Sequence, residues 1–446
     1  MDRQPQPRRT SRRTSRRDFL RTASAWAAAP WVIPAAPWVI PAAAWGAQLR
    51  RAPSDRIITA LIGSGSRGQQ IMAGGDKVVA VCDVDAKHRA AAKAAIDAKA
   101  GNRDCAEYGD FREVLARDDI DAVVIATPDH WHVPAALAAV KAGKAVYVEK
   151  PLSYCIREGR ILADAVERYG TILQVGSQQR SPEYANFTRA VEMVRNGKLG
   201  ELKTAKVLIY ARSGKDNPWT PYRVPPELDY EMWLGPAPYS PYHPERLHYK
   251  FRFVSDFSGG DITNWGAHHL DIAQWGVGAD DSGPVEVVGR GKRNIHGVHD
   301  TFYDIAVDFL YANGAKVELR STEKGGTGWV RFEGTEGWVQ VSREGIDAEP
   351  KSLLDWRLGP GDERIVPEPL AGTHMGIWLE CIRTRNRRAL NVPAETAHRS
   401  ATVCHLANIS MELERPLEWD PAAEEFVGDD EANRMRWRAP REPWEL

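Results

Sequence analysis

The stretch IITALIGSGSRGQQI, residues 57–71, decides the fold of the first part of this chain. An apolar run typical of a buried strand leads into Gly63, Gly65 and Gly68, which have GxGxxG spacing, and a helical pattern follows. The first glycine permits a tight turn, the second lets the backbone approach a pyrophosphate, and the third lets helix and strand pack closely. This combination predicts the first strand, loop and helix of a dinucleotide-binding domain.

An acidic residue follows where such a domain requires one. A second apolar strand, within VVAVCDVD, ends at Asp83, which stands twenty residues after Gly63. A carboxylate there binds the ribose 2′-hydroxyl of NAD and repels the 2′-phosphate of NADP. We therefore predict NAD as the cofactor. The residues expected to bind it are Gly63, Gly65, Ser66, Arg67, Gly68, Asp83, Thr127, Pro128, His132, Glu149 and Lys150.

Further apolar segments alternate with alanine-rich helical stretches. These segments are residues 122–132, 145–151 and 171–180. Strands that alternate with helices predict an α/β fold, here a Rossmann domain with a doubly wound parallel sheet over residues 55–176. Ligands of such sheets bind at the carboxyl ends of the strands, which is where TPDHWH (127–132) and Lys150 stand.

The remaining residues, 177–446, predict a second α/β domain, because 446 residues are enough for two cores. Apolar and polar residues alternate between turn sequences over residues 286–343, as in a large, mostly antiparallel sheet. Helical spacing returns at residues 374–413, and these C-terminal helices are candidates to pack back on the first domain. Residues 210–256 are rich in Pro, Tyr and Trp without a regular period, and a loop of that length is usually functional.

The stretch SGGDITNWGAHHLDIAQW, residues 258–275, combines a helical pattern with many polar groups. On a regular helix one face carries four of them: Asp261, Asn264, His268 and Asp271. Buried polar groups are costly unless they are paired or used, so this face is either a satisfied network or a working site. The neighbouring His269 points about 100° away, so it cannot join His268 on one ion, and no metal site is predicted.

TPDHWH, VEKP (148–151) and SGGDITNWGAHHLD, in that order behind GxGxxG, resemble the Gfo/Idh/MocA family over about residues 55–410. The resemblance implies an NAD(P)-dependent sugar or polyol oxidoreductase with an N-terminal Rossmann domain and a C-terminal α/β domain built on a large antiparallel sheet. Lys150 matches the family lysine near the nicotinamide and the reacting hydroxyl. His268 matches the family histidine that acts as general base or orients the hydroxyl.

Asn264 departs from the family pattern, because it stands where the family has an aspartate. An amide cannot accept a proton at a working pH, although it can hold a hydroxyl or fix an imidazole tautomer. Proton removal then falls to His268, whose unperturbed pKa of about 6.5 suits it, while Lys150 lowers the pKa of the alcohol. We expect three further residues to contact the carbohydrate substrate: Arg180, Trp265 and Asp271.

The first 47 residues have the pattern of an export signal. SRRDFL (15–20) precedes an apolar, alanine-rich run and a small-residue end at Ala47, and Arg16 and Arg17 resemble the twin-arginine consensus. We therefore expect the twin-arginine export machinery as a partner and a periplasmic or otherwise exported protein.

The later residues lack the roughly 18 consecutive apolar residues of a membrane helix, so the mature form is not expected to span a membrane. Residues 1–47 carry eight arginines and two aspartates, so the net charge of -1 leaves about -7 on the rest of the chain, and nucleic acid is not an expected partner. A homo-oligomer is expected.

Three functions remain open from the sequence. The first is an exported sugar or polyol oxidoreductase that holds NAD tightly, because no free NAD pool exists outside the cytoplasm. The second is a redox-neutral glycosidase or epimerase, in which a transient keto sugar acidifies the adjacent proton. The third is a non-catalytic NAD-binding scaffold, which the presence of Lys150 and His268 disfavours.

Overall fold

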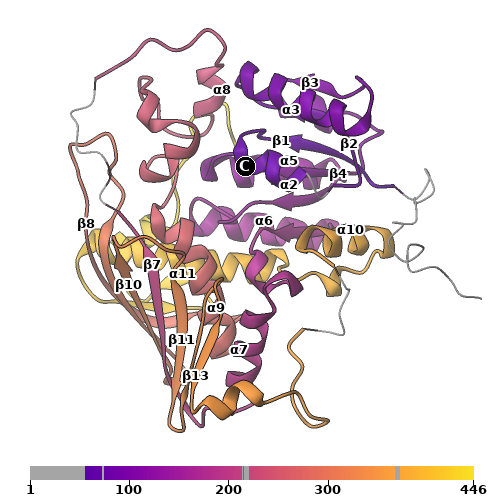
Figure 1. The fold of residues 1–446 in the computed structure, drawn as a ribbon. Coiled ribbons are helices and arrows are strands. Elements are labelled where there is room, and N and C mark those ends of the chain that lie inside the picture. Colours follow the sequence, from indigo (N-terminus) through magenta and orange to yellow (C-terminus); the bar gives the residue numbers. More distant parts are fainter. Residues whose placement is uncertain (1–55, 73–74, 213, 215–219, 367–371) are drawn as a thin grey trace, which may run out of the picture. The chain divides into compact units, whose positions relative to one another are not determined.

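The computed structural model describes residues 56–72, 75–212, 214, 220–366 and 372–446. The expected export signal, residues 1–47, lies outside these residues. The described residues belong to one compact unit that contains two β-sheets (Figure 1). Within them, no helix has the length and apolar character needed to cross a membrane.

The N-terminal domain is built on a six-stranded sheet whose neighbouring strands are all parallel. Its order is β3-β2-β1-β4-β5-β6, with the reversal between β1 and β4 that marks the ligand crevice of doubly wound folds. The predicted α/β fold with a parallel sheet is therefore confirmed. The strands are β1 (Ile58–Ile62), β2 (Lys77–Cys82), β3 (Ala106–Tyr108), β4 (Ala122–Ile125), β5 (Ala145–Val148) and β6 (Leu173–Val175).

Helices cover both faces of this sheet. Leu61 and Ile62, adjacent in β1, enter different apolar clusters, because successive side chains of a strand point to opposite faces. The cluster around Leu61 includes Trp378 from α10 (His374–Thr384), so a C-terminal helix packs on the N-terminal sheet. The other helices of this domain are α2 (Ser66–Met72), α3 (Ala86–Ala100), α4 (Phe111–Leu115), α5 (His132–Lys141) and α6 (Ile156–Tyr169).

The second sheet has nine strands in the order β13-β12-β11-β7-β10-β9-β8-β14-β15, and only the pair β7 and β10 is parallel. This confirms the predicted large, mostly antiparallel sheet. The strands are β7 (Leu202–Tyr210), β8 (Pro284–Lys292), β9 (Tyr303–Tyr311), β10 (Lys316–Thr322), β11 (Trp329–Gly334), β12 (Trp338–Val341), β13 (Ile346–Glu349), β14 (Leu417–Asp420) and β15 (Glu425–Phe426).

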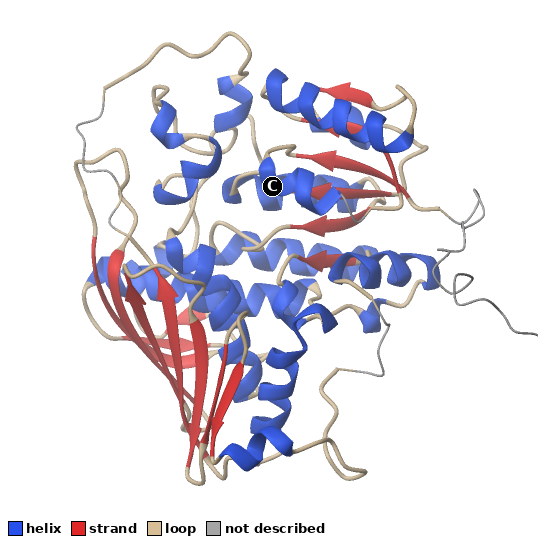
Figure 2. Ribbon diagram, in the orientation of Figure 1, coloured by secondary structure: helices blue, strands red, loops and turns tan. Residues whose placement is uncertain are grey.

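Helices α7 (Ala185–Arg195), α9 (Ala267–Val277) and α11 (Ala394–Leu413) pack on one face of the second sheet (Figure 2). The apolar core of this domain lies between them and the strands. A short helix, α12 (Asp430–Arg434), follows β15.

The segment 210–256 contains more regular structure than its sequence predicts. Its described part holds α8 (Tyr230–Leu234) and two 3-10 helices, Pro244–Arg246 and His248–Phe253, around a small apolar core of its own. Each of these helices has at most six residues, which is too few to give a helical period in the sequence.

The stretch 258–275 is not a regular α-helix throughout. A π-helical turn, Ile262–Gly266, precedes α9, which begins at Ala267. A π turn closes its hydrogen bonds over five residues instead of four, so a uniform spacing of 100° does not hold across it. The expected single polar face is therefore wrong.

Candidate functional site

The glycine loop between β1 and α2 has the geometry expected for pyrophosphate binding. Gly63 has a φ of +85°, and a Cβ there would lie 2.7 Å from the backbone of Ala126. A Cβ on Gly68 would fall on the carbonyl oxygen of Gly63, so helix and strand touch there. A Cβ on Gly65 would meet no heavy atom within 4 Å, and Gly65 lines a cavity. The backbone at Gly65 is thus open to a ligand.

Asp83 stands at the end of β2 and lines the same cavity, which has a volume of about 280 Å³. Its Oδ2 accepts hydrogen bonds from the backbone N of Ser64 at 2.7 Å and from the Ser64 hydroxyl at 3.0 Å. Its Oδ1 accepts from the backbone N of Asp85 at 2.9 Å. These contacts fix the carboxylate beside the glycine loop, where a ribose of a dinucleotide would lie.

A second cavity, of about 470 Å³, adjoins the first. It is lined by the predicted catalytic residues Lys150, Asn264 and His268, and by Trp265. The two cavities share these lining residues: Ser66, Arg67, Ala126, Thr127, Tyr249, Phe251 and Arg252. A dinucleotide seated on the glycine loop in the first cavity would therefore reach the catalytic residues in the second.

Lys150 and Asn264 are bonded directly to each other. Lys150 Nζ donates to the side-chain Oδ1 of Asn264 at 2.8 Å and to its backbone oxygen at 3.1 Å. Arg252 Nη1 also donates to this Oδ1, at 3.3 Å, while the amide Nδ2 donates to Asp261 Oδ1 at 3.3 Å. The amide therefore turns its oxygen toward two cations, and it orients the lysine rather than accepting a proton.

Burial sets the electrostatics of the catalytic pair. It lowers the pKa of Lys150 to about 8, partly against the opposing effect of the nearby carboxylate of Glu149. Burial, followed by the positive charges of Lys150 and Arg343, holds the pKa of His268 well below its usual value. The expected unperturbed pKa of His268 is therefore wrong. The imidazole is neutral at physiological pH, and its Nδ1 is buried with no hydrogen-bond partner in the part of the chain that the structure describes.

Most of the predicted cofactor residues line the two cavities. Gly63, Gly65, Ser66, Arg67, Asp83, Thr127 and Pro128 line the first cavity, and His132, Glu149 and Lys150 line the second. Glu149 Oε1 accepts from Arg67 Nη2 at 2.8 Å. The His132 ring lies between the backbone oxygens of Pro151, at 2.6 Å, and Thr127, at 3.0 Å. Gly68 is the exception, because it packs inside the turn.

Arg180 and Asp271 do not line either cavity, so their predicted contact with substrate is corrected. Arg180 Nε and Nη2 donate to the two carboxylate oxygens of Asp271 at 2.9 and 2.8 Å, and Asp280 accepts from the same guanidinium at 2.8 Å. The Ser400 hydroxyl donates to Asp271 at 2.6 Å. Both members of the first pair are almost fully buried, which makes them a structural ion pair. His269 is a core residue, whose Nε2 lies 2.6 Å from the Thr327 carbonyl.

Several cavity residues carry no sequence motif. Arg252 comes from the 3-10 helix His248–Phe253, within the segment whose length indicated a functional role. Arg343, in the turn after β12, and Tyr184, before α7, also line the catalytic cavity. No pattern in the sequence marks these positions, since each reaches the site only through the tertiary fold.

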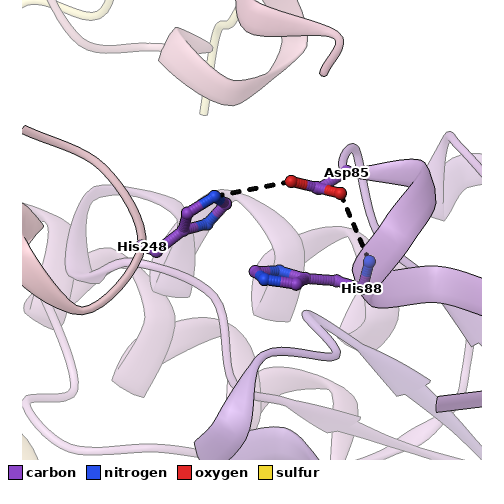
Figure 3. A group of neighbouring side chains, drawn as sticks. All are labelled: Asp85, His88 and His248. Atoms are coloured by element: carbon purple, nitrogen blue, oxygen red, sulfur yellow. Dashed lines mark hydrogen bonds and ion pairs between the residues drawn. The ribbon is translucent and has the colours of Figure 1, made fainter. Parts of the chain in front are cut away.

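Three neighbouring side chains, those of Asp85, His88 and His248, lie together beside the first cavity (Figure 3). Asp85 caps α3, accepting from the backbone of His88, and its Oδ2 lies 3.4 Å from His248 Nε2. The three residues hold possible metal-ligand atoms within 4.8 Å of one another. The rings of His88 and His248 are in packing contact, with centroids 4.3 Å apart, and both line the first cavity. The contact joins the segment 210–256 to the N-terminal domain beside the cofactor site.

Two family models match the chain. One is described as "Oxidoreductase family, NAD-binding Rossmann fold" and matches residues 57–177, and the other as "Oxidoreductase family, C-terminal alpha/beta domain" and matches residues 206–446.

Curated relatives match over a shorter region. A "Glycosyl hydrolase family 109 protein" of Saccharopolyspora erythraea is 35% identical over 159 residues, which are 33% of this chain and 34% of that protein. A "Glycosyl hydrolase family 109 protein 2" of Shewanella sp. (strain ANA-3) is 36% identical over 158 residues, with the same shares. The match thus spans about a third of these relatives.

Solved structures share the fold. The WlbA dehydrogenase from Bordetella pertussis, in complex with NADH and UDP-GlcNAcA, has a TM-score of 0.59 at 18% identity, over 82% of this chain and 99% of that one. The aldose-aldose oxidoreductase from Caulobacter crescentus, complexed with glycerol, has a TM-score of 0.60 at 18% identity, over 81% and 99%.

Proposed function

Because this chain belongs to the Gfo/Idh/MocA family of oxidoreductases, we propose that it is an exported NAD-dependent enzyme that oxidises a hydroxyl of a sugar, polyol or glycoside. The observation that carries the proposal is the meeting of Lys150, Asn264 and His268 in one cavity, which adjoins the cavity of the glycine loop. A non-catalytic scaffold has no need of this arrangement.

The residues of the first cavity fit NAD. The open backbone at Gly65 suits the pyrophosphate, and the fixed carboxylate of Asp83 suits a ribose with a free 2′-hydroxyl. When bound, NAD would accept the hydride of the carbon that bears the reacting hydroxyl.

Each of the three proposed catalytic residues has a different role in proton removal. A lysine ammonium has three donors, and Lys150 uses two on the oxygens of Asn264, which leaves one for the substrate hydroxyl. Its positive charge stabilises the developing alkoxide. His268 is neutral and lines the same cavity, so it is available to accept the proton. Asn264 holds the lysine in place.

The segment 210–256 forms part of the wall of the first cavity, which supports a tightly held cofactor. Besides the glycine loop, the cavity is lined by Met232, Trp233, His248 and Tyr249, all from the segment 210–256. An exported enzyme would find no NAD pool, so the reduced cofactor must be reoxidised by a second substrate or by a later step of the same reaction. Both export and assembly into a homo-oligomer remain predictions.

A second candidate is a redox-neutral glycoside hydrolase or epimerase that uses the same catalytic residues. The names of the two relatives, "Glycosyl hydrolase family 109 protein" and "Glycosyl hydrolase family 109 protein 2", favour it. In this reaction the substrate would be oxidised only transiently, and the ketone would acidify the neighbouring C–H bond before it is reduced again.

One experiment tests the proposal directly. Protein purified without added cofactor is denatured, and the released small molecules are identified by mass spectrometry. We expect NAD, and a site that releases no nucleotide would contradict the proposal.

An aryl glycoside then separates the two candidates. A redox-neutral hydrolase releases the aglycone without net NADH and exchanges a C2 deuterium with water. A net oxidoreductase does neither, and it needs an added carbonyl acceptor for repeated turnover.

A further inference from the structure

Four positively charged side chains line the catalytic cavity: Arg67, Lys150, Arg252 and Arg343. Three of these side chains form contacts that are described above. Arg67 pairs with Glu149 at 2.8 Å, and both Lys150 and Arg252 donate to the Asn264 amide oxygen. Arg67 and Arg252 also line the cofactor cavity, so the cofactor pyrophosphate is within their reach. Arg343 lines the catalytic cavity but not the cofactor cavity.

Arg343 is held in place by uncharged groups. Its guanidinium lies over the rings of Tyr184 and Trp265, each with a centroid at 5.2 Å. With the amide of Gln179 turned so that its nitrogen donates to the His268 carbonyl, the Gln179 oxygen accepts from Arg343 Nε at 3.3 Å. These contacts fix the plane of the guanidinium and leave its two terminal nitrogens without a hydrogen-bond acceptor among the described residues.

No carboxylate forms an ion pair with Arg343 in the part of the chain that the structure describes. The adjacent Glu344 is engaged elsewhere, because both its oxygens accept from the Thr327 hydroxyl, at 2.7 and 2.9 Å. Glu183, which lines the same cavity, accepts from the backbone N of His374 at 2.7 Å. Burial lowers the pKa of Arg343, and the opposing effects of Tyr184, Glu344 and Glu149 are smaller.

We propose that Arg343 is an anion subsite and that the substrate is an acidic sugar, whose oxyanion pairs with Arg343 while a hydroxyl meets Lys150 and His268. The inference rests on the proposed function, since it places the substrate in the same cavity. Arg343, Lys150 and His268 line the same cavity, and the Trp265 ring lies beside both the His268 ring, with centroids 6.0 Å apart, and the Arg343 guanidinium. The planar fork of an arginine suits a carboxylate or a phosphate in two-point contact.

Matched sugars test the subsite. NAD-containing protein is titrated with D-glucose, D-glucuronate and D-glucose 6-phosphate, and with the corresponding galactose series, and binding is followed by calorimetry. A charge-assisted hydrogen bond is worth about 1.5–3 kcal/mol, so we expect the acidic member of a bound series to bind about 10- to 150-fold more tightly than the neutral one. Preference for the uronate assigns a carboxylate substrate, and preference for the phosphate assigns a phosphorylated one.

Two arginine variants make the test specific. In Arg343→Gln the ratio of the affinity for the acid to the affinity for the neutral sugar should fall to about one, while the thermal unfolding midpoint stays near wild type. Arg331→Gln is the matched control: Arg331 also lies over a tryptophan ring, that of Trp338 at 3.9 Å, but it does not line the cavity. This variant should keep the preference.

Three results would overturn the subsite: equal affinities for acid and neutral sugar, a preference that survives Arg343→Gln, or no binding by any acidic sugar in the panel. The nucleotide content of each preparation separates this failure from that of the proposed function. Protein that contains NAD but does not prefer acids refutes the anion subsite alone. Protein that releases no NAD on denaturation refutes the proposed function.

Discussion

Gly65→Ala tests the cofactor site with little disturbance of the fold. The added methyl group would meet no heavy atom within 4 Å, and residue 65 lines the first cavity, so the methyl would occupy space available to the pyrophosphate. A charge-assisted hydrogen bond from the loop to a phosphate is worth about 1.5–3 kcal/mol. Loss of one such bond corresponds to NAD binding that is about 10- to 150-fold weaker.

The assay is the NAD content of the purified variant after extensive dialysis, measured by mass spectrometry, together with its stability in urea. Gly345→Ala is the matched control, because a Cβ there also meets nothing within 4 Å and the residue lines neither cavity. It should change neither quantity. Gly68→Ala should instead lower the stability in urea, because its methyl would fall on the backbone oxygen of Gly63. Such overpacking costs about 1–3 kcal/mol.

The result that refutes this reasoning is full retention of NAD by Gly65→Ala at wild-type stability. The loop would then not approach the phosphates, and the cavity beside Asp83 would have to bind another part of the cofactor, or another ligand. A loss of NAD that accompanies equal destabilisation in Gly65→Ala and Gly68→Ala would also contradict it, because the two glycines would then share one structural role.

Four further outcomes follow from the site. The Lys150 ammonium, with a pKa of about 8, loses its proton as pH rises, so turnover in a pH–rate profile should fall about tenfold from pH 7 to pH 9. In Lys150→Arg the guanidinium stays charged, so this decline should be absent over the same pH interval. His268→Ala should lower kcat about 100-fold or more and Asn264→Ala less. Asp271→Ala should lower the free energy of unfolding by about 1.5–3 kcal/mol in urea, since it removes the buried partner of Arg180 and leaves Asp280 to pair with the guanidinium. Asp83→Ser should narrow the preference for NAD over NADP in binding titrations.

The N-terminal sheet could be predicted because its signals are local. Strands β1, β2, β4, β5 and β6 lie in apolar segments of the sequence, and the glycine spacing and Asp83 directly follow β1 and β2. The three-residue β3, with the sequence AEY, carries no such pattern. Strand β7 could not be predicted in the same way, although it lies in the middle of the second sheet. Its parallel partner β10 begins more than 100 residues later, at Lys316, so its place in the sheet depends on a long crossover that no local pattern records.

The stretch 258–275 shows where a regular periodicity misleads. Counting residues at 100° places Asn264, His268 and Asp271 on one face, but the π-helical turn at Ile262–Gly266 breaks that count. Asn264 and His268 line the catalytic cavity, whereas Asp271 lies in a buried pair with Arg180. Motif identity therefore predicted which of these residues line the cavity better than helical geometry did.

Asn264, which lies in this π-helical turn, stands where the family resemblance leads one to expect an aspartate. Lys150 donates to both the side-chain and the backbone oxygen of Asn264, so the position supplies two neutral acceptors to one ammonium. A carboxylate there would stabilise the charged lysine and raise its pKa. With an amide, burial keeps the Lys150 pKa near 8, close to the pH at which a lysine can both stabilise an alkoxide and exchange a proton. With an amide at this position, Lys150 thus keeps two hydrogen-bond acceptors and a pKa near 8.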